Sequence, residues 1–173
     1  MKVRVEDIPP EGLEVEFGDA RTGAKGLGPQ VAGLASAPWA WVRLERRRSL
    51  VLARGRYQAL VELECSRCLQ GFTESLDGAL DWAFRPPDAF RGEEMRLAED
   101  ELDVIFYQGG EVDLAQALRD ELSLSLPIAP LCCPDCPGLC PVCGKEQRDG
   151  ACGCRSKQTA FRWAKLANLA KLE

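Results

Sequence analysis

Cysteine dominates the chemistry that this sequence can support. The chain has nine cysteines and no histidine. It therefore lacks the residues for a Ser–His–Asp triad, for a Cys–His catalytic pair and for a zinc site with histidine ligands. Four pairs of thiolates suffice for two four-coordinate metal sites. Eight of the cysteines form such pairs: Cys65 with Cys68, Cys132 with Cys136, Cys140 with Cys143, and Cys152 with Cys154.

The C-terminal pairs have the pattern of a zinc knuckle. In the stretch CPVCG at 140–144, the proline fixes the turn and the glycine permits the left-handed backbone that follows it. The CxC pair comes soon enough afterwards to complete a tetrahedral site with a short ribbon. We predict one structural zinc ion bound by Cys140, Cys143, Cys152 and Cys154.

A second zinc site is predicted from the two remaining pairs, Cys65 with Cys68 and Cys132 with Cys136. These pairs are distant in the sequence, so only the fold can bring them together. A shell of four thiolates is closed and leaves no position for a substrate, so we expect the one or two zinc ions to be structural. Cys133 stands beside Cys132 and leaves open which of the two thiols binds.

Other interpretations of the cysteines give different chemistry. A redox pair would use Cys65 and Cys68, with Arg67 between them to activate a thiol, but no βαβ pattern surrounds this CxxC. An iron–sulfur cluster also takes four cysteines, although the CPVCG turn favours zinc. Scattered buried thiols would not be expected to fall into four spaced pairs.

Charge is distributed unevenly along the chain, whose formal net charge is −5. Residues 43–67 carry seven bases and three acids, and residues 145–173 likewise carry seven bases and three acids. Residues 74–121 between them carry four bases and fourteen acids. The net charge argues against a general nucleic-acid coat. If the two basic segments lie on one face of the protein, that face can contact phosphate. The alternative is that the basic and acidic segments form solvated faces whose charges balance one another.

Arginine suits RNA because its planar guanidinium binds phosphate bidentately and stacks on bases. Trp39 and Trp41, beside the first basic segment, can stack on unpaired bases, although strand tryptophans are more commonly buried. Further basic residues in the C-terminal segment are Arg155, Lys157, Arg162 and Lys165. The candidate nucleic-acid contacts are Arg43, Arg46, Arg47, Arg48, Arg54, Arg56 and Arg67.

The spacing of apolar residues predicts secondary structure along most of the chain. Leucines that recur every four residues predict a helix over 114–126, capped by Asp113 and ended by Pro127. Helical spacing also occurs over 156–173. Alternating or short apolar runs predict strands at 13–17, two or three within 39–68, one at 72–84 (or a short helix there) and one at 102–109. Loops are expected at 18–38 and 88–101.

These elements indicate an α+β fold. We expect an antiparallel β meander or barrel-like sheet with one or two packing helices, followed by a cysteine-rich zinc-knuckle segment and a terminal helix. The expected division is a β-rich domain at 1–130 and a zinc-binding segment at 131–173. No apolar run approaches the roughly 20 residues that span a bilayer, and the N-terminus does not have the pattern of a signal segment. We expect a cytoplasmic protein without a membrane partner.

Two cysteine-bearing segments resemble the YceD family. The first is CSRCL at 65–69, and the second runs from LPIAPLC at 126–132 to CPGLCPVCG at 136–144. Their order and distance are specific, and the resemblance covers most of the chain. The sequence departs from the family pattern at 145–148, where an Asn-rich stretch is expected, and at Cys133. The matching positions are Cys65, Arg67, Cys68, Cys132, Cys136, Gly138, Leu139, Cys140, Cys143, Gly144, Cys152 and Cys154.

The resemblance implies a non-enzymatic factor that large-subunit ribosomal RNA needs in order to accumulate. Its partner would be precursor large-subunit ribosomal RNA or a large-subunit ribosomal protein, and it would take no small-molecule substrate. The alternative is a protein-interaction module whose acidic segment at 93–103 binds a basic ribosomal protein without RNA contact. A third hypothesis, an oxidoreductase, requires a metal-free thiol pair at Cys65 and Cys68.

Overall fold

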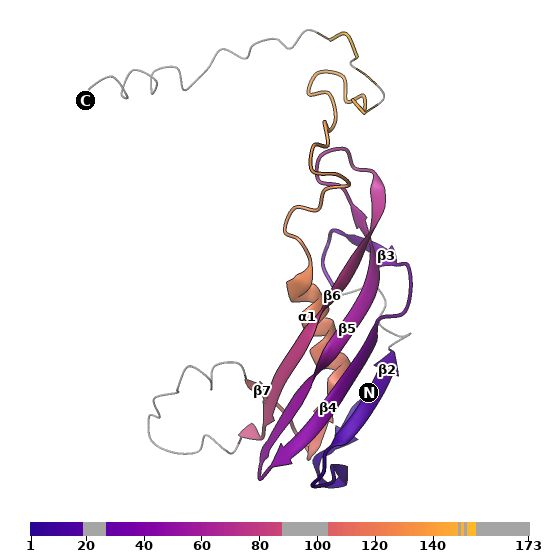
Figure 1. Ribbon diagram of the computed structural model, residues 1–173. Helices are drawn as coiled ribbons and strands as arrows, with labels where there is room; N and C mark the ends of the chain where they lie inside the picture. The colour runs from indigo at the N-terminus through magenta and orange to yellow at the C-terminus, as the bar shows by residue number, and fades with distance from the viewer. Residues whose placement is uncertain (19–26, 88–103, 149, 151, 155–173) are drawn as a thin grey trace, which may run out of the picture.

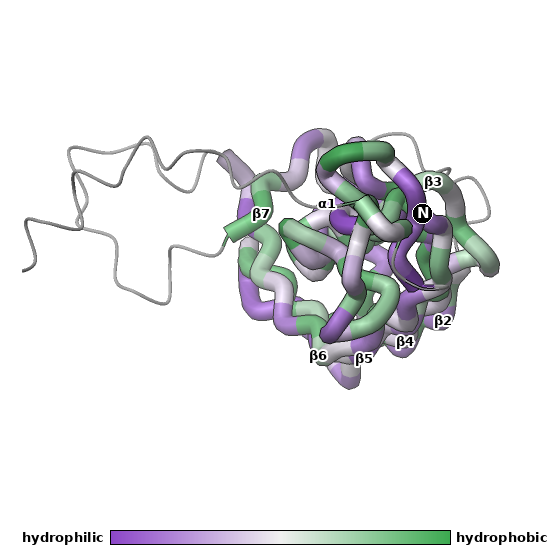
Figure 2. Tube along the Cα trace, turned by 90° about the horizontal axis from the view of Figure 1, so that it is seen from above, coloured by the Kyte–Doolittle hydropathy of each residue, from purple (hydrophilic) through white to green (hydrophobic). Residues whose placement is uncertain are grey.

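The computed structural model confirms the α+β class: a six-stranded, mainly antiparallel sheet curls around one helix (Figures 1 and 2). The loop expected over 88–101 and the helix expected over 156–173 lie outside the described residues. No described helix has the length and apolar character needed to cross a membrane. The structure describes residues 1–18, 27–87, 104–148, 150 and 152–154.

A long hairpin of two 15-residue strands, β5 (Leu50–Glu64) and β6 (Gly71–Arg85), forms the centre of the sheet. Buried positions alternate with more exposed ones along much of both strands, so one face of the hairpin is buried and the other meets solvent. At about 3.3 Å per residue the hairpin is roughly 50 Å long. It therefore separates the turn before β5 from the turn between β5 and β6 by most of the molecule's length (Figure 1).

Shorter strands extend the sheet on both sides of the hairpin. β4 (Trp39–Arg47) pairs with β5, and β2 (Leu13–Gly18) pairs with β4, both antiparallel. The loop expected over 18–38 is partly wrong, because β3 (Val31–Leu34) pairs with the end of β5 that β4 does not reach. β7 (Val104–Phe106) pairs parallel to β6. The connection between β6 and β7 is long enough for a parallel neighbour, unlike the tight turns of the meander.

The single described helix, α1 (Leu114–Ser125), lies across the inner face of the sheet (Figure 2). The predicted N-cap is confirmed, since the Asp113 carboxylate accepts a hydrogen bond from the backbone N–H of Gln116 over 3.2 Å. β1 (Lys2–Arg4) pairs with β8 (Glu111–Asp113) in a two-stranded sheet at the start of the helix, and a short 3-10 turn (Val5–Asp7) follows β1.

The core lies between α1 and the inner face of the sheet. Leu114, Leu118 and Leu122 of the helix are at most 1% exposed, and they pack in one cluster with Phe84 and other inward residues of the strands. Complete burial of each leucine stabilises the fold by about 1.5–3 kcal/mol. A hydrogen bond of 3.2 Å from the Trp82 indole to the Glu121 carboxylate adds a polar contact between sheet and helix. The helix is therefore held over the centre of the hairpin.

Candidate metal centres and the outer face of the sheet

Four cysteine sulfurs meet at the end of the β5–β6 hairpin and form what we call the first cysteine cluster: Cys65, Cys68, Cys132 and Cys136. All four Sγ atoms lie within 4.8 Å of one another. Cys65 and Cys68 come from the turn between β5 and β6, and the other two come from the chain that follows α1. The pairing of distant cysteines that the sequence predicts is therefore present in the structure.

The sulfur spacing of the first cysteine cluster fits a tetrahedral zinc ion. The Sγ atoms of Cys65 and Cys136 are 3.7 Å apart, as are those of Cys68 and Cys132. Zinc–sulfur bonds of about 2.3 Å in a tetrahedron place neighbouring sulfurs about 3.8 Å apart. A disulfide would need about 2.05 Å, and all nine cysteines are free. The donor set is thus suited to zinc and leaves no coordination position for a substrate.

Backbone hydrogen bonds shape the turn that carries Cys65 and Cys68. The N–H of Cys65 donates to the Gln70 carbonyl and the N–H of Leu69 donates to the Cys65 carbonyl, both over 2.9 Å. Leu69 has a φ of 61°, in the left-handed region. The Ser66 N–H donates to the Pro130 carbonyl over 2.8 Å. This last bond fixes the segment after α1 against the turn and so brings the two cysteine pairs together.

The pKa values of the thiols in the first cysteine cluster suit the binding of a cation. Burial by itself raises the pKa of the Cys65 thiol, but the backbone N–H groups of Cys132, Cys68 and Arg67 lower this pKa to about 6. Burial and the neighbouring thiols raise the pKa of Cys132. One thiol therefore ionises readily while another keeps its proton until a cation replaces it.

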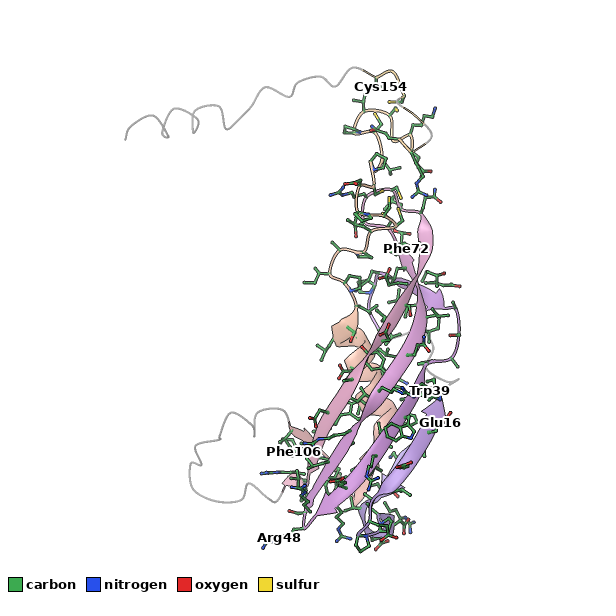
Figure 3. All side chains as sticks on the ribbon, in the orientation of Figure 1. Glu16, Trp39, Arg48, Phe72, Phe106 and Cys154 are labelled. Carbon is green, nitrogen blue, oxygen red and sulfur yellow. The ribbon has the colours of Figure 1, made fainter. Side chains whose placement is uncertain are left out.

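The second cysteine cluster contains Cys140, Cys143, Cys152 and Cys154, with all four Sγ atoms within 4.8 Å of one another. The Val142 N–H donates to the Cys140 sulfur over 3.4 Å, as expected for a zinc knuckle. The backbone N–H groups of Cys143 and Val142 lower the pKa of Cys140 to about 6. The Cys152 side chain raises the pKa of Cys154 to about 12. This cluster lies beyond the first, at the far end of the molecule from Arg48 (Figure 3).

The structure also separates the two adjacent thiols that the sequence leaves ambiguous. Cys132 belongs to the first cysteine cluster, whereas Cys133 is exposed, belongs to neither cluster, and has its sulfur 4.0 Å from that of Cys132. The main-chain turn explains this arrangement, because the Cys136 N–H donates to the Cys133 carbonyl over 3.2 Å. The thiol of Cys133 is thus left at the surface.

The face of the sheet turned away from α1, here called the outer face, carries tryptophans and arginines around a shallow groove of about 650 Å³. The Trp39 indole donates to the Glu16 carboxylate over 2.6 Å, and both side chains point outward from neighbouring strands (Figure 3). The guanidinium of Arg56 lies over the Trp39 ring, 5.8 Å from its centre. The groove is lined by Glu16, Trp39, Trp41, Arg43, Arg54, Gly55 and Arg56.

Gly55 allows β4 and β5 to pair closely beneath this groove. It lies opposite Val42 in the β4–β5 ladder. A Cβ at this position would collide with the carbonyl oxygen of Trp41. The two strands thus approach so closely that only glycine fits.

Acids accompany the arginines of the outer face, a feature that sequence reasoning missed. Register places Glu14, Arg43, Arg54 and Asp81 in one row across four strands. The Arg43 guanidinium is 3.2 Å from the Glu14 carboxylate, and that of Arg54 is 3.3 Å from the Asp81 carboxylate. The alternating acids of 13–17 were the available signal, because a strand with that alternation places them on one face.

The seven candidate arginines do not gather in one patch. Arg43, Arg54 and Arg56 share the outer-face groove. Residues 46–48 lie at the turn between β4 and β5, where the Arg46 guanidinium donates to the carbonyls of Val5 and Arg48, each over 3.3 Å. Arg67 lies at the opposite end of the hairpin.

Arg67 serves the first cysteine cluster instead of the outer face. Its guanidinium donates to the Cys136 carbonyl over 3.0 Å, and its own carbonyl accepts from the Leu139 N–H over 3.2 Å. The Arg67 backbone and side chain therefore hold the chain between the two cysteine clusters against the hairpin turn. The remaining basic candidates, Arg155, Lys157, Arg162 and Lys165, lie outside the described residues.

Comparison with known proteins assigns the chain to a family. The family model described as "Large ribosomal RNA subunit accumulation protein YceD" matches residues 53–170, which is more than half of the chain. The chain belongs to the YceD family. The matched range contains both cysteine clusters and the central hairpin, and the family description names no catalytic activity.

Relatives in the family differ in how much of their length the chain covers. A protein of Haemophilus influenzae named "Large ribosomal RNA subunit accumulation protein YceD" is 30% identical over 122 residues, which are 70% of this chain and 67% of that protein. An uncharacterized protein of Mycobacterium tuberculosis is 37% identical over 128 residues, covering 74% of this chain. The chain spans only 59% of that mycobacterial protein. No solved structure matches the chain.

Proposed function

We propose that this chain is a non-enzymatic factor that supports the accumulation of large-subunit ribosomal RNA by contacting the precursor RNA. The contact surface is the outer face of the sheet, and the two cysteine clusters hold structural zinc. Membership of the YceD family supports the link to large-subunit ribosomal RNA. A cytoplasmic location follows from this role.

The outer-face groove is the observation that carries the proposal. Trp39 and Trp41 are half-buried, so each ring keeps accessible surface on which an unpaired base can stack. Arg54 and Arg56 follow along the neighbouring strand, and the side chain of Arg54 is 65% exposed. Arginine beside aromatic rings on a sheet is the arrangement that binds the backbone and bases of single-stranded RNA. To bind RNA, Arg43 and Arg54 must give up their ion pairs with Glu14 and Asp81. This loss offsets part of the binding free energy, so we expect a local contact of moderate strength.

Zinc in the two cysteine clusters has a structural part in this proposal. Eight cysteines would hold two ions, and no residue among these eight is left to act on a substrate. The ions fix the segment after α1 on the hairpin, because the first cysteine cluster joins the turn at 65–68 to residues 132–136. The protein then presents a rigid scaffold without a catalytic centre.

A basic ribosomal protein is the second candidate partner, and one observation favours it. The acids Glu14, Glu16 and Asp81 stand on the same face as the arginines, so this surface is close to neutral. Such a surface can exchange its internal ion pairs for pairs with a basic chain. The acidic segment 93–103 lies outside the described residues.

Titration of the full chain against a single-stranded fragment of precursor large-subunit RNA, at several salt concentrations, tests the proposal. The variant combines Arg54→Ala and Arg56→Ala. Its matched control combines Lys2→Ala and Arg4→Ala, which removes the same charge from β1, outside the groove. We expect weaker binding for the groove variant only. The logarithmic salt slope should fall by about 0.7 for each arginine that contacts a phosphate.

The outcomes distinguish the groove from the alternatives. Equal loss of RNA affinity in both variants would mean that binding follows net charge and would contradict the groove as the site. If neither variant changes RNA binding, while Glu14→Gln with Asp81→Asn abolishes capture of a basic large-subunit ribosomal protein, the second candidate is correct. Sedimentation in a sucrose gradient then shows whether the chain sediments with large-subunit precursors and whether it dissociates from them as the salt concentration increases.

A further inference from the structure

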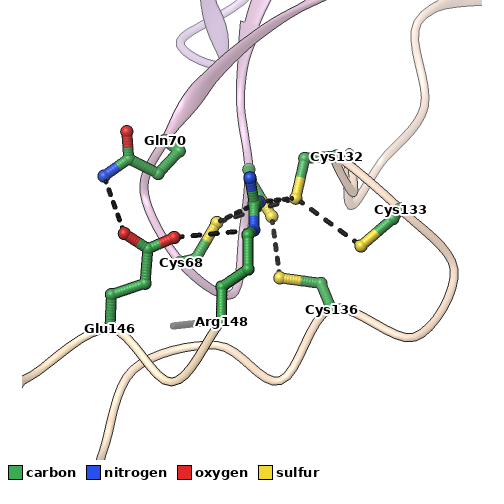
Figure 4. Close-up of polar contacts among 8 residues, drawn as sticks. Cys68, Gln70, Cys132, Cys133, Cys136, Glu146 and Arg148 are labelled. Carbon is green, nitrogen blue, oxygen red and sulfur yellow. Dashed lines mark hydrogen bonds and ion pairs between the residues drawn. The ribbon is translucent and has the colours of Figure 1, made fainter. Parts of the chain in front are cut away.

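Arg148 connects the two cysteine clusters. It lies in the chain between Cys143 and Cys152, inside the loop that the second cysteine cluster closes. Its guanidinium nevertheless contacts sulfurs of the first cysteine cluster: Nη2 is 2.7 Å from the Sγ of Cys132 and 3.6 Å from that of Cys68 (Figure 4). One residue of the second metal loop is thus a neighbour of the first metal site.

The loop that carries Arg148 is held in place by backbone contacts with residues 138–140. Leu139 and Glu146 form an isolated antiparallel bridge. The Gln147 N–H donates to the Gly138 carbonyl over 3.1 Å, and the Cys140 N–H donates to the carbonyl of residue 145 over 2.8 Å. These bonds position the chain just before Arg148. One of them starts from Cys140, a residue of the second cysteine cluster, so the position of Arg148 is linked to that cluster through the backbone.

Glu146 and Gln70 complete the contact. The Glu146 carboxylate is 3.6 Å from the Arg148 guanidinium, and it accepts a hydrogen bond from the Gln70 amide over 3.3 Å (Figure 4). Gln70 belongs to the hairpin turn that also supplies Cys68. Arg148 is therefore oriented toward the sulfurs by a residue of its own loop, and that residue is in turn held by the turn of the first cysteine cluster.

The contact between Arg148 and the cysteine sulfurs would affect how tightly the first cysteine cluster binds a metal ion, because the guanidinium is positively charged. A zinc ion with four thiolates carries a net charge of −2, and this charge would be partly buried at the first cysteine cluster, where Cys65 is fully buried. A guanidinium that donates to the sulfurs offsets part of that charge. Groups that hydrogen-bond to metal ligands commonly change metal affinity by 10–100-fold when removed.

We propose that the two metal sites are energetically coupled through Arg148. Metal in the second cysteine cluster orders residues 140–148, and Arg148 then strengthens metal binding at the first cysteine cluster. By linkage, metal at the first cluster strengthens binding at the second to the same degree. The coupling rests on the proposed occupancy of both clusters by zinc.

The experiment measures metal retention at each cluster separately in the full zinc-loaded chain. Samples are equilibrated with graded concentrations of a zinc chelator, unprotected thiols are alkylated, and mass spectrometry of the peptides reports protection at 65–68 and at 140–143. Native mass spectrometry counts the ions per chain. The variants are Arg148→Met, the pair Cys152→Ser with Cys154→Ser, and their combination. Lys145→Met is the matched control, because Lys145 is exposed in the same loop.

We expect Arg148→Met to lower zinc affinity at the first cysteine cluster about 10–100-fold, and Lys145→Met to leave it within twofold. The double serine variant should cause a similar loss there. Arg148→Met should then add nothing in the serine background, because its loop is no longer ordered. Arg148→Lys, which keeps the charge, should retain part of the affinity and shows that the arginine position tolerates substitution.

Two results would overturn the coupling. One is unchanged affinity at the first cysteine cluster in Arg148→Met, and the other is full additivity of the arginine and serine substitutions. A wild-type chain that binds no zinc at either cluster would instead refute the metal assignment itself, and the coupling with it. The ion count separates these two failures.

Discussion

The hydroxyl groups of Tyr57 and Ser125 lie 2.6 Å apart and join the middle of β5 to the last turn of α1. Tyr57 is 5% exposed, so its hydroxyl is largely removed from water. The chain leaves α1 directly after Ser125 and continues to the first cysteine cluster. This contact therefore fixes the point from which the metal-binding segment departs.

Replacement Tyr57→Phe should destabilise the fold by about 1–2 kcal/mol, because the Ser125 hydroxyl then loses its partner in a partly buried place. Urea unfolding followed by circular dichroism measures the change. Tyr107→Phe is the control, since the Tyr107 hydroxyl donates to the Ser49 carbonyl over 3.1 Å at an exposed site. A loss no greater for Tyr57→Phe than for Tyr107→Phe would contradict the expectation.

Two leucines of α1 separate the effect of core packing from that of helix propensity. Leu118 is 1% exposed and Leu124 is 84% exposed. Leu118→Ala should cost about 2–5 kcal/mol of unfolding free energy because it leaves a cavity. Leu124→Ala should change stability by about 0.5 kcal/mol or less. Similar losses for the two variants in urea unfolding would mean that α1 does not pack on the sheet through Leu118.

Zinc removal should loosen the end of the hairpin and spare the core. The first cysteine cluster ties residues 132–136 to the turn at 65–68, whereas the core between α1 and the sheet contains none of these cysteines. Hydrogen exchange with and without chelator should show faster exchange at 65–70 and 130–147, with protection in β5 and α1 retained. Uniform loss of protection would mean that the metal sites are needed for the whole fold.

Zinc affinity should fall as pH falls, because protons compete with zinc for the thiolates. At pH 7.5 Cys65 and Cys140, each with a pKa of about 6, are ionised. The pKa values of Cys68 and Cys132 are raised and that of Cys154 is about 12, so zinc must displace their protons. Each displaced proton contributes about a tenfold fall in affinity per pH unit, so the fall should be steeper at the first cysteine cluster. It should steepen further below pH 6 as Cys65 and Cys140 protonate.

Competition with a chelator of known proton affinity, between pH 5.5 and 8, measures this dependence. The stability of the metal-free chain should depend on pH in the same direction. The lowered pKa of Cys65 stabilises the fold at pH 9 and above, and this contribution declines as the pH falls toward 6. A zinc affinity that does not change over the tested range would contradict thiolate ligation at both clusters.

Sequence reasoning succeeded where the determining interactions are local. The repeat of leucines every four residues and the Asp113 cap predict α1 because both act within one or two turns. The spacing of the cysteine pairs likewise indicates two four-sulfur groups, since a CxxC turn presents two thiolates to one ion. Only the structure shows that Cys132, and not Cys133, belongs to the first cysteine cluster.

The remaining features depend on contacts between distant parts of the chain. β3 has four residues and only two large apolar side chains, so its pairing with β5 leaves no strong local pattern. The arginines read as one basic segment in sequence, but strand direction distributes them between the outer face, the β4–β5 turn and the first cysteine cluster. The acid partners Glu14 and Asp81 are set by register, which the sequence does not reveal before strand order is known.

The length of the β5–β6 hairpin sets a minimum size for any partner that bridges its two ends. Arg48 and Cys154 lie at opposite extremes of the molecule (Figure 3), and the hairpin between them measures roughly 50 Å. A small ligand or a short peptide can occupy one end only. Only a macromolecule of comparable length can contact both ends. The hairpin would then hold the two contact points on such a partner at a fixed separation.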